Sequence, residues 1–448
     1  MPVASDPIAI QPVGPFRASI TPPGSKSLTN RALLLAALAE GRSTLGGVLF
    51  SDDTRVMLDA LAKLGFALDI DEAGCTVAVA GRGGDIPARS ADLHLGNAGT
   101  AYRFLTAACC LGAPAPASVY TLDGVPRMRQ RPIGQLVDAL RDLKADIEYL
   151  GDEGFPPLRV RAAGLAGGRL HMPPTLSSQY ISALLQVGPC CREALTIHCD
   201  GPVTSRPYVE MTLGMMHHFG AVFAVNGPFT AIRVEPTGYT ACDHAIEPDA
   251  SNASYFLAAA AAVPGAKCTV HGLGFKSLQG DAWFADYVLE KMGAAVIYEP
   301  DAITVMAPPE GERLKGIDID LNPMPDMAQT LACVALFAAG DTVIRNVGNL
   351  RVKETDRLAA LQTELTKLGA KVRIEGDDLF ITPPNGNRIT PAAIDTYDDH
   401  RMAMSFAVVG LAAPAPGITI NDPACVNKTF PEFFSYLHRL RAEQNSRG

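Results

Sequence analysis

The chain has 448 residues, of which 48% are hydrophobic and 19% charged, and its formal net charge is −9. This length exceeds one ordinary hydrophobic core and predicts two or three domains. The acidic balance argues against nucleic acid or an anionic membrane as the main partner, and we find neither a membrane span nor a targeting segment, so we expect a cytoplasmic protein. An anionic small molecule stays compatible, because one cleft can be basic within an acidic surface.

The first distinctive segment runs from Pro23 to Arg31 and leads into an apolar helix ending near Leu38. This helix is apolar on nearly every face, so we expect it to be buried together with its first turn, which carries Lys26 and Arg31. Cations are disfavoured at a helix N-terminus, whereas the unpaired N–H groups there attract anions. A bound phosphate or carboxylate would account for both features. The alternative is a helix capped by Ser27 whose basic side chains reach solvent.

Three later segments of the first half resemble this helix opening. The glycines of 96–103 let backbone N–H groups approach a ligand closely, just before an apolar run. Segment 123–132 holds three arginines within five positions, and we favour Arg127 as an anion ligand because a guanidinium matches carboxylate and phosphate oxygens. Residues 177–179 open a helix expected over 180–186; they can cap it or present hydroxyls and an amide to a sugar-like ligand.

One helix ending recurs along the whole chain, an apolar residue followed by Gly or Ala and then a β-rich run. The marker residues are Leu64, Leu143, Phe219, Met292, Leu368 and, more weakly, Leu440, with separations of 79, 76, 73, 76 and 72 residues. This period is too long for a solenoid and predicts six small α/β units, with glycine at the helix C-cap. Three units precede residue 245 and three follow it, so we expect two lobes with a ligand cleft between them.

The second half holds the candidates for acid–base chemistry. Asp326 precedes an apolar helix, so a role as the helix N-cap is the alternative. Lys353 and Arg357 are four residues apart, which predicts one helix face with Glu354 beside them; a solvated ion-pair face is the alternative there. Two further basic residues stand at similar openings, Arg401 and Lys428. Basic groups at helix openings in both halves predict a cleft for a ligand with several negative charges.

Together these motifs resemble the 5-enolpyruvylshikimate-3-phosphate (EPSP) synthase family. The motifs that carry the resemblance, in the family's order, are 23–27, 97–101, 126–128, 177–179, 249–251, 352–357, 399–402 and 428–430. The resemblance implies an α/β (α+β) fold, a two-lobed inside-out α/β barrel with three βαβαββ repeats in each lobe. Lobe one would comprise residues 1–22 plus 246–448 and lobe two residues 23–245, with the active site in the cleft between the lobes.

The resemblance also implies a transferase reaction. The enolpyruvyl group of phosphoenolpyruvate passes to the 5-hydroxyl of shikimate 3-phosphate by addition and elimination through a tetrahedral intermediate, and phosphate is released. This is a step of the shikimate pathway to aromatic amino acids. No metal or organic cofactor is implied, the partners are the two small-molecule substrates, with no nucleic acid and no membrane, and we expect a monomer because the lobes must move freely.

Site residues follow from the resemblance by motif. It implies that shikimate 3-phosphate is contacted by Lys26, Ser27, Arg31, Ser177, Ser178, Gln179, Ser205, Asp326, Asn349 and Lys353. It implies that phosphoenolpyruvate is contacted by Lys26, Gly99, Arg127, Gln179, Arg357, Arg401 and Lys428. Each substrate carries a phosphate and a carboxylate, which Lys, Arg and helix N-termini can neutralise. Addition needs a base for the hydroxyl proton and an acid for the vinyl carbon, and we assign Asp326 as base, Glu354 as proton donor and Lys26 as charge stabiliser.

One residue departs from the family's pattern, since Phe104 stands where common members have proline. Proline would sit in the first turn of the helix, whereas phenylalanine is bulkier and restores an N–H group, so the placement of Gly99 and Thr100 is expected to differ. The family's inhibitor glyphosate occupies the phosphoenolpyruvate site beside that glycine. The departure therefore leaves glyphosate sensitivity open.

Two other functions compete with this one. UDP-N-acetylglucosamine enolpyruvyl transferase shares the fold and phosphoenolpyruvate, but it typically carries a reactive cysteine in a mobile loop, whereas Cys109 and Cys110 lie in an apolar run. These thiols, like the pair Cys190 and Cys191, are expected to be free and buried. A nonenzymatic anion-binding or RNA-associated protein on a similar repeat fold is disfavoured by the acidic net charge and by the presence of two candidate acid–base carboxylates, Asp326 and Glu354.

Overall fold

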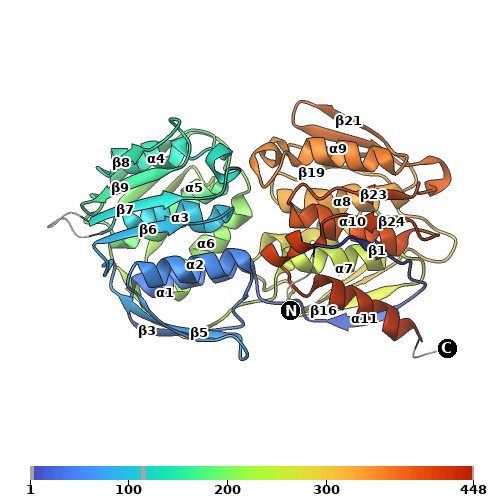
Figure 1. The fold of residues 1–448 in the computed structure, drawn as a ribbon, viewed down its shortest axis with the longest axis horizontal. Coiled ribbons are helices and arrows are strands. Elements are labelled where there is room, and N and C mark those ends of the chain that lie inside the picture. The colour runs from blue at the N-terminus through green and yellow to red at the C-terminus, as the bar shows by residue number, and fades with distance from the viewer. Residues whose placement is uncertain (1–4, 113–117, 446–448) are drawn as a thin grey trace. The chain divides into compact units, whose positions relative to one another are not determined.

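The structure is a computed structural model that describes residues 5–112 and 118–445 (Figure 1). The chain forms two compact units. Unit 1 combines Met1–Pro23 with Glu247–Gly448, and unit 2 is Gly24–Ile246. Unit 2 is therefore an insertion into the sequence of unit 1.

Unit 2 repeats the order helix, strand, helix and β-hairpin three times. The first repeat consists of α1 (Lys26–Leu38), β3 (Ala39–Gly46), α2 (Asp52–Lys63), β4 (Ala67–Asp71) and β5 (Thr76–Arg82). The second consists of β6 (Ser90–His94), α3 (Gly99–Cys109), β7 (Ser118–Asp123), α4 (Gly134–Asp142), β8 (Asp146–Tyr149) and β9 (Leu158–Ala162). The third consists of β10 (Gly168–Met172), α5 (Ser178–Val187), β11 (Leu195–Cys199), α6 (Arg206–His218), β12 (Phe223–Val225) and β13 (Ala231–Val234).

Each repeat of unit 2 builds its own sheet. The strand orders are β6-β7-β9-β8 and β10-β11-β13-β12, in which the first pair is parallel and the others are antiparallel. The first repeat has no leading strand of its own. Two short strands from the end of the unit, β14 (Tyr239–Thr240) and β15 (His244–Ala245), pair in parallel with β3 in its place.

Unit 1 contains the other three repeats. The first is formed by β2 (Arg17–Ile20), α7 (Ala250–Ala262), β16 (Lys267–His271), the π-helical η4 (Ala285–Glu290), β17 (Ala295–Tyr298) and β18 (Ala302–Met306). The second is formed by β19 (Asp318–Asp320), α8 (Ala328–Val334), β20 (Thr342–Arg345), α9 (Arg357–Lys367), β21 (Lys371–Glu375) and β22 (Asp378–Thr382). The third is formed by β23 (Ala392–Ile394), α10 (His400–Ala412), β24 (Ile418–Ile420), α11 (Phe433–Asn445) and β1 (Ile8–Ile10).

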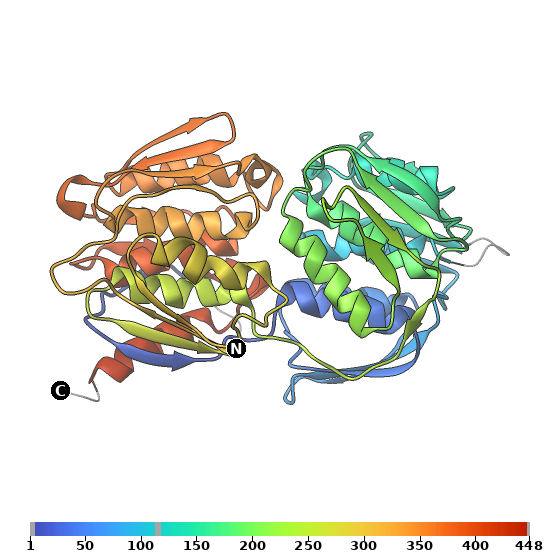
Figure 2. The same ribbon diagram turned by 180° about the vertical axis from the view of Figure 1, so that it is seen from behind.

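The N-terminal segment completes two sheets of unit 1. Strand β2 pairs in parallel with β16 in the sheet β17-β18-β16-β2, and β1 pairs antiparallel with β24 in the sheet β1-β24-β23. The middle repeat forms the sheet β19-β20-β22-β21, whose hairpin β21–β22 is at one edge (Figure 2). The expected fold of two lobes with repeated α/β units is confirmed, with the last repeat shortened. Across the described ranges no sheet closes on itself.

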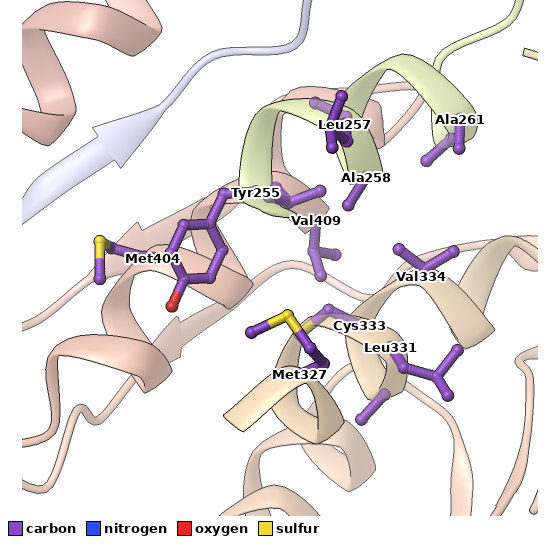
Figure 3. Close-up of a cluster of buried hydrophobic side chains, with 14 of the residues drawn as sticks. Tyr255, Leu257, Ala258, Ala261, Met327, Leu331, Cys333, Val334, Met404 and Val409 are labelled. Carbon is purple, nitrogen blue, oxygen red and sulfur yellow. The ribbon is translucent and has the colours of Figure 1, made fainter. Parts of the chain in front are cut away.

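The first helix of each repeat is the buried one. Every residue of α3, α7 and α8 is buried, as are nearly all residues of α1, α5 and α10, whereas α2, α4 and α9 bury only part of their length. In unit 1, Leu257 of α7, Leu331 of α8 and Val409 of α10 belong to one cluster of buried hydrophobic side chains (Figure 3). This packing explains why these helices are apolar on every face.

The recurring helix ending has the same geometry in each full repeat. After α2 the chain turns at Gly65, with φ 89°, and the N–H of Phe66 bonds to the carbonyl of Leu61 at 3.1 Å. The same bond, from the second residue past the helix cap back to the last turn, closes the other four marker helices. The predicted C-cap glycine is thereby confirmed, except that Lys144 adopts the left-handed conformation in the second repeat.

Candidate active site

Helix α1 in unit 2 begins at Lys26, and Ser25 is its N-cap. The Ser25 hydroxyl accepts a hydrogen bond from the N–H of Leu28 at 3.4 Å. Ser27 lies inside the first turn, so the alternative in which Ser27 caps the helix is wrong.

The Arg31 side chain is buried in the middle of unit 2, only 2% exposed. Its Nε donates to Thr212 Oγ1 at 2.8 Å, and its terminal nitrogens donate to the carbonyls of Ser27 at 2.9 Å and Tyr208 at 3.2 Å. The guanidinium carbon also lies 5.1 Å from the centre of the Phe104 ring. Burial lowers the pKa of Arg31 to about 10, so it stays a cation at neutral pH. Arg31 therefore connects the openings of α1, α3 and α6.

Lys26 at the start of α1 is paired within unit 2. Its Nζ lies 3.3 Å from Asp53 Oδ2, and both side chains are largely buried. Asp53 belongs to the first turn of α2, where a carboxylate is favoured by the helix dipole. Sequence reasoning missed Asp53, although an acidic pair at the start of a predicted helix was a visible signal.

The openings of α3 and α5 are brought together by a side-chain hydrogen bond. Gln179 Nε2 donates to Thr100 Oγ1 at 3.3 Å. Ser177 caps α5, because its hydroxyl accepts the N–H of Gln179 at 3.2 Å, while Ser178 is the first helical residue. The capping alternative therefore holds for Ser177. The opening of α6 follows Ser205, whose backbone is left-handed with φ 51°.

Arg131 is the arginine of segment 123–132 that packs against Gly99. A Cβ atom on Gly99 would lie 2.5 Å from Arg131 Nη2, so a larger residue there would displace the end of the Arg131 side chain. Arg131 Nη1 also donates to the carbonyl and the side-chain oxygen of Asn97, both at 3.1 Å. Arg127 is partly exposed, with a contact from Nη1 to Gln130 Oε1 at 3.3 Å. Sequence reasoning favoured Arg127 and had no signal for the burial of Arg131.

Phe104 lies deeper in its helix than expected. Because α3 starts at Gly99, residue 104 belongs to the second turn, and the placement in the first turn is wrong. The Phe104 side chain is fully buried beneath the Arg31 guanidinium. A proline here would remove the helical N–H that faces the carbonyl of Thr100.

In unit 1, Asp326 is the centre of a cluster of three carboxylates and three cations. Its Oδ1 lies 3.1 Å from Arg357 Nη1 and 3.6 Å from Lys353 Nζ, and its Oδ2 lies 2.8 Å from Arg401 Nη2. Asp326 sits in the 3₁₀ turn Pro325–Met327 before α8 and makes no side-chain cap bond. The N-cap alternative for Asp326 is therefore wrong.

Arg357 binds the remaining two carboxylates of the cluster. Its Nη2 lies 2.9 Å from Glu354 Oε2, and its Nε lies 2.7 Å from Asp399 Oδ2. Arg357 is the first residue of α9, whose N-cap is Asp356. Because Lys353 and Glu354 precede the helix, the expected helix face through Lys353 and Arg357 is wrong. These two cations meet through the Asp326 carboxylate, and the solvated alternative is also wrong because Arg357 is only 1% exposed.

Arg401 joins this cluster from the opening of α10. Its Nη2 is the partner of Asp326, its Nη1 contacts the Tyr255 hydroxyl at 3.4 Å, and its N–H donates to Asp399 Oδ1 at 2.9 Å. Asp399 is fully buried and caps α10. Sequence reasoning did not place Asp399 or Tyr255 in the site. The cap position of Asp399 was readable, but its pairing with Arg357 was not.

The electrostatics of this cluster stabilise the charged forms of Asp326 and Arg357. Burial raises the pKa of Asp326, but Arg401, Lys353 and Arg357 outweigh burial and hold that pKa well below its usual range. Burial lowers the pKa of Arg357, and the neighbouring carboxylates more than restore it. An incoming anion therefore competes with Asp326 for these cations.

The last two predicted residues of unit 1 lie on short helical turns. Asn349, 9% exposed, belongs to η7 (Gly348–Val352), which directly precedes Lys353. Lys428, 8% exposed, ends η9 (Pro423–Lys428). Burial raises the pKa of Asp398, and the nearby Lys428 opposes this rise. Lys428 therefore lies close to the loop that leads into α10.

The fold and these helix openings define a two-unit α/β protein whose buried helices present charged residues suited to a small anionic ligand. Residues 10–437 match the family model described as EPSP synthase (3-phosphoshikimate 1-carboxyvinyltransferase). The chain belongs to the EPSP synthase family.

Individual relatives agree with this family. The chain is 48% identical over 434 residues to a 3-phosphoshikimate 1-carboxyvinyltransferase of Marinomonas sp. (strain MWYL1), covering 97% of this chain and 99% of the relative. It is 49% identical over 439 residues to the protein of that name from Vibrio atlanticus (strain LGP32), with coverage of 97% and 99%. An EPSP synthase structure from Acinetobacter baumannii superimposes with a TM-score of 0.77 at 26% identity, covering 96% of this chain and 97% of that one.

The rival enolpyruvyl transferase is not favoured by these similarities. The cysteines agree with this, because Cys109 and Cys110 are buried at the end of α3 and burial raises the pKa of both thiols. Within the described part of the chain, no helix is long and apolar enough to cross a bilayer.

Proposed function

We propose that this chain transfers the enolpyruvyl group of phosphoenolpyruvate to the 5-hydroxyl of shikimate 3-phosphate and releases phosphate, in the shikimate route to aromatic amino acids. The observation that carries the chemistry is the Asp326 cluster, in which a partly buried carboxylate is held ionised by three cations. The protein acts as a cytoplasmic monomer on these two small molecules, without nucleic acid, membrane, metal or organic cofactor.

Both units contribute ligands in this proposal. Shikimate 3-phosphate contacts Lys26, Ser27, Arg31, Ser177, Ser178, Gln179, Ser205, Asp326, Asn349 and Lys353. Phosphoenolpyruvate contacts Lys26, Gly99, Arg127, Gln179, Arg357, Arg401 and Lys428. The buried helix openings support this division, because their N–H groups and cations favour anions. The substrates close the two units on each other and exclude water from the reaction.

Asp326 acts as the base that accepts the 5-hydroxyl proton. In the free protein its cations Lys353, Arg357 and Arg401 make it a poor base, because they stabilise the ionised form. Substrate phosphate and carboxylate groups take over these donors when they bind. The Asp326 carboxylate then loses its stabilising partners and its affinity for a proton rises, so basicity is gained only in the loaded site.

Glu354 acts as the proton donor to the vinyl carbon. It is 8% exposed and lies beside Arg357, the cation that binds phosphoenolpyruvate. Attack of the 5-oxygen on carbon 2 and protonation of carbon 3 give the tetrahedral intermediate. The methyl group then returns a proton, the carbon–oxygen bond to phosphate breaks, and phosphate leaves. The negative charge of the substrates favours the protonated form of this carboxyl before addition.

Lys26 stabilises charge on both substrates. In the free protein it is paired with Asp53 at 3.3 Å, which keeps the ammonium at the opening of α1. A compact ammonium beside helix N–H groups can bind a phosphate oxygen that gains charge as the carbon–oxygen bond breaks.

The activity is tested by phosphate release from phosphoenolpyruvate, measured alone, with shikimate 3-phosphate and with UDP-N-acetylglucosamine. We expect release only with shikimate 3-phosphate. Release only with the nucleotide sugar would establish the rival transferase, and no release with either acceptor, while phosphoenolpyruvate still binds, would leave a nonenzymatic anion-binding protein.

A further inference from the structure

The segment that leads into α10 contains two consecutive non-glycine residues in the left-handed backbone region. Tyr397 and Asp398 have φ values of 55° and 54°. They are the central residues of a tight turn, which is closed by a hydrogen bond of 2.9 Å from the N–H of Asp399 to the carbonyl of Thr396. Residues with a Cβ atom seldom adopt this conformation, because the Cβ crowds the following carbonyl oxygen. The turn therefore needs tertiary contacts that hold it.

Two members of the ion-pair cluster directly follow this turn. Asp399, the next residue, caps α10, and its Oδ2 lies 2.7 Å from Arg357 Nε. Arg401 comes two residues later, and its Nη2 lies 2.8 Å from Asp326 Oδ2. The positions of Asp399 and Arg401 in the cluster therefore depend on the conformation of the turn.

A fully buried carboxylate of α9 binds this turn. The Oε1 atom of Glu364 accepts the hydroxyl of Tyr397 at 2.6 Å. Its Oε2 atom accepts the N–H of Asp395 at 3.3 Å and lies 2.8 Å from Lys367 Nζ. Burial and the bond to Glu364 raise the pKa of Tyr397 to about 12, so its hydroxyl stays a donor at neutral pH. A hydrogen bond to a charged acceptor is stronger than one between neutral groups, and burial strengthens it further.

Glu364 and Arg357 lie on one face of α9, because they are about two helical turns apart. Both contact the segment before α10, Arg357 through Asp399 and Glu364 through Tyr397. We propose that Glu364 and Tyr397 are positioning residues of the active site, whose hydrogen bond holds the left-handed turn. In this way they set the position of Arg401 relative to Arg357. The inference rests on the proposed function, in which these two arginines bind phosphoenolpyruvate.

Two substitutions of Tyr397 separate this role from simple packing, by steady-state kinetics on the full chain. Tyr397→Phe removes only the hydroxyl and keeps a residue that disfavours the left-handed region. Tyr397→Asn also removes the hydrogen bond, because its side chain is too short to reach Glu364, but asparagine tolerates that region.

The two variants are expected to differ in a set order. We expect Tyr397→Phe to lower kcat/KM for phosphoenolpyruvate at least about fivefold, while KM for shikimate 3-phosphate changes less than about twofold. We expect Tyr397→Asn to keep at least about twofold more of kcat/KM than Tyr397→Phe, although it removes more of the side chain. A role in packing alone would give the opposite order.

Tyr298→Phe is the matched control. It removes another tyrosine hydroxyl of unit 1, which donates to the carbonyl of Ala282 from the ordinary strand β17, and we expect unchanged kinetics. Native kinetics in Tyr397→Phe, an equal loss for both substrates, or no advantage of Tyr397→Asn over Tyr397→Phe would overturn the positioning role while leaving the proposed function intact.

Failure of the proposed function has a different signature, since the native chain would then release no phosphate. The inference is in that case decided by isothermal titration calorimetry with phosphoenolpyruvate. Weaker binding by Tyr397→Phe than by Tyr397→Asn supports it, and any other result, including no binding to the native chain, overturns it.

Discussion

Replacing Asp399 tests how much of unit 1 depends on the ion-pair cluster. Asp399→Ala removes a fully buried carboxylate that binds Arg357 Nε at 2.7 Å and caps α10 through the N–H of Arg401 at 2.9 Å. Removing one partner of a buried ion pair typically costs about 3–5 kcal/mol, because the remaining charge stays desolvated. The lost cap accounts for roughly 1 kcal/mol of this. The remaining partners of Arg357, Glu354 and Asp326, limit the loss to this range.

Asp356→Ala is the matched control. Asp356 also caps a helix of unit 1, accepting the N–H groups of Leu358 and Ala359, both at 3.1 Å. Its side chain is 42% exposed, so this variant loses a cap and a weak surface contact with Arg351. We expect a loss of about 1 kcal/mol.

Differential scanning calorimetry at neutral pH measures both variants. In a domain of this size, 1 kcal/mol corresponds to about 2–4 °C in Tm. We therefore expect the unit 1 transition to fall by about 6–20 °C in Asp399→Ala and by about 2–4 °C in Asp356→Ala. Equal shifts in the two variants would refute the view that the buried pair with Arg357, rather than capping, dominates.

Four further outcomes are expected. Glu354→Gln keeps substrate KM near the native value but lowers kcat by about 10²-fold or more, as steady-state kinetics would measure, and a native kcat would exclude Glu354 as proton donor. Lys26→Ala lowers kcat as well as raising KM for both substrates, so an effect on KM alone would contradict its role in charge stabilisation. Phe104→Pro removes the ring beneath Arg31 and one helical N–H, and is expected to change the glyphosate inhibition constant; identical constants would make the residue irrelevant to inhibition. Because the pKa of Asp326 is depressed, its contribution to stability is present above the ordinary carboxyl pKa and lost as the pH falls through the folded pKa. We therefore expect the Tm curves of the native chain and Asp326→Asn to converge as the pH falls below the ordinary carboxyl pKa; parallel curves would argue against the depressed pKa.

The repeat architecture could be predicted from the sequence because it depends on short, local residue patterns. One left-handed residue follows each marker helix, and it is glycine in every full repeat except the second, where it is Lys144. The all-apolar helices reflect burial on every side. The N-terminal strands were less readable. Strand β2 pairs with β16 about 250 residues later, and such a distant parallel pairing leaves no periodic trace in either segment.

The site could be predicted only in part. The helix openings are local features of the sequence, whereas the ion pairs join residues that are distant in the sequence. Lys353, Glu354 and Arg357 were found, but their spacing was taken for a helix face. The Asp356 carboxylate caps α9 immediately before Arg357, so Lys353 and Glu354 lie outside the helix. An Asp before an apolar run is a recognised sign of a helix start and could have predicted this boundary. The contact of Arg131 with Gly99 depends on tertiary packing alone.

The interruption of unit 1 by unit 2 has a consequence for biosynthesis. The first 23 residues supply β1 and β2, whose partners β24 and β16 are made only after all of unit 2 has emerged from the ribosome. Unit 2 is therefore the part able to fold during translation, while the opening strands wait for their sheets. The two points where the insertion leaves and rejoins unit 1 are adjacent, since the N–H of Asp249 bonds to the carbonyl of Pro23 at 2.8 Å. A short linker between Pro23 and Glu247 would thus turn unit 1 into a single uninterrupted polypeptide.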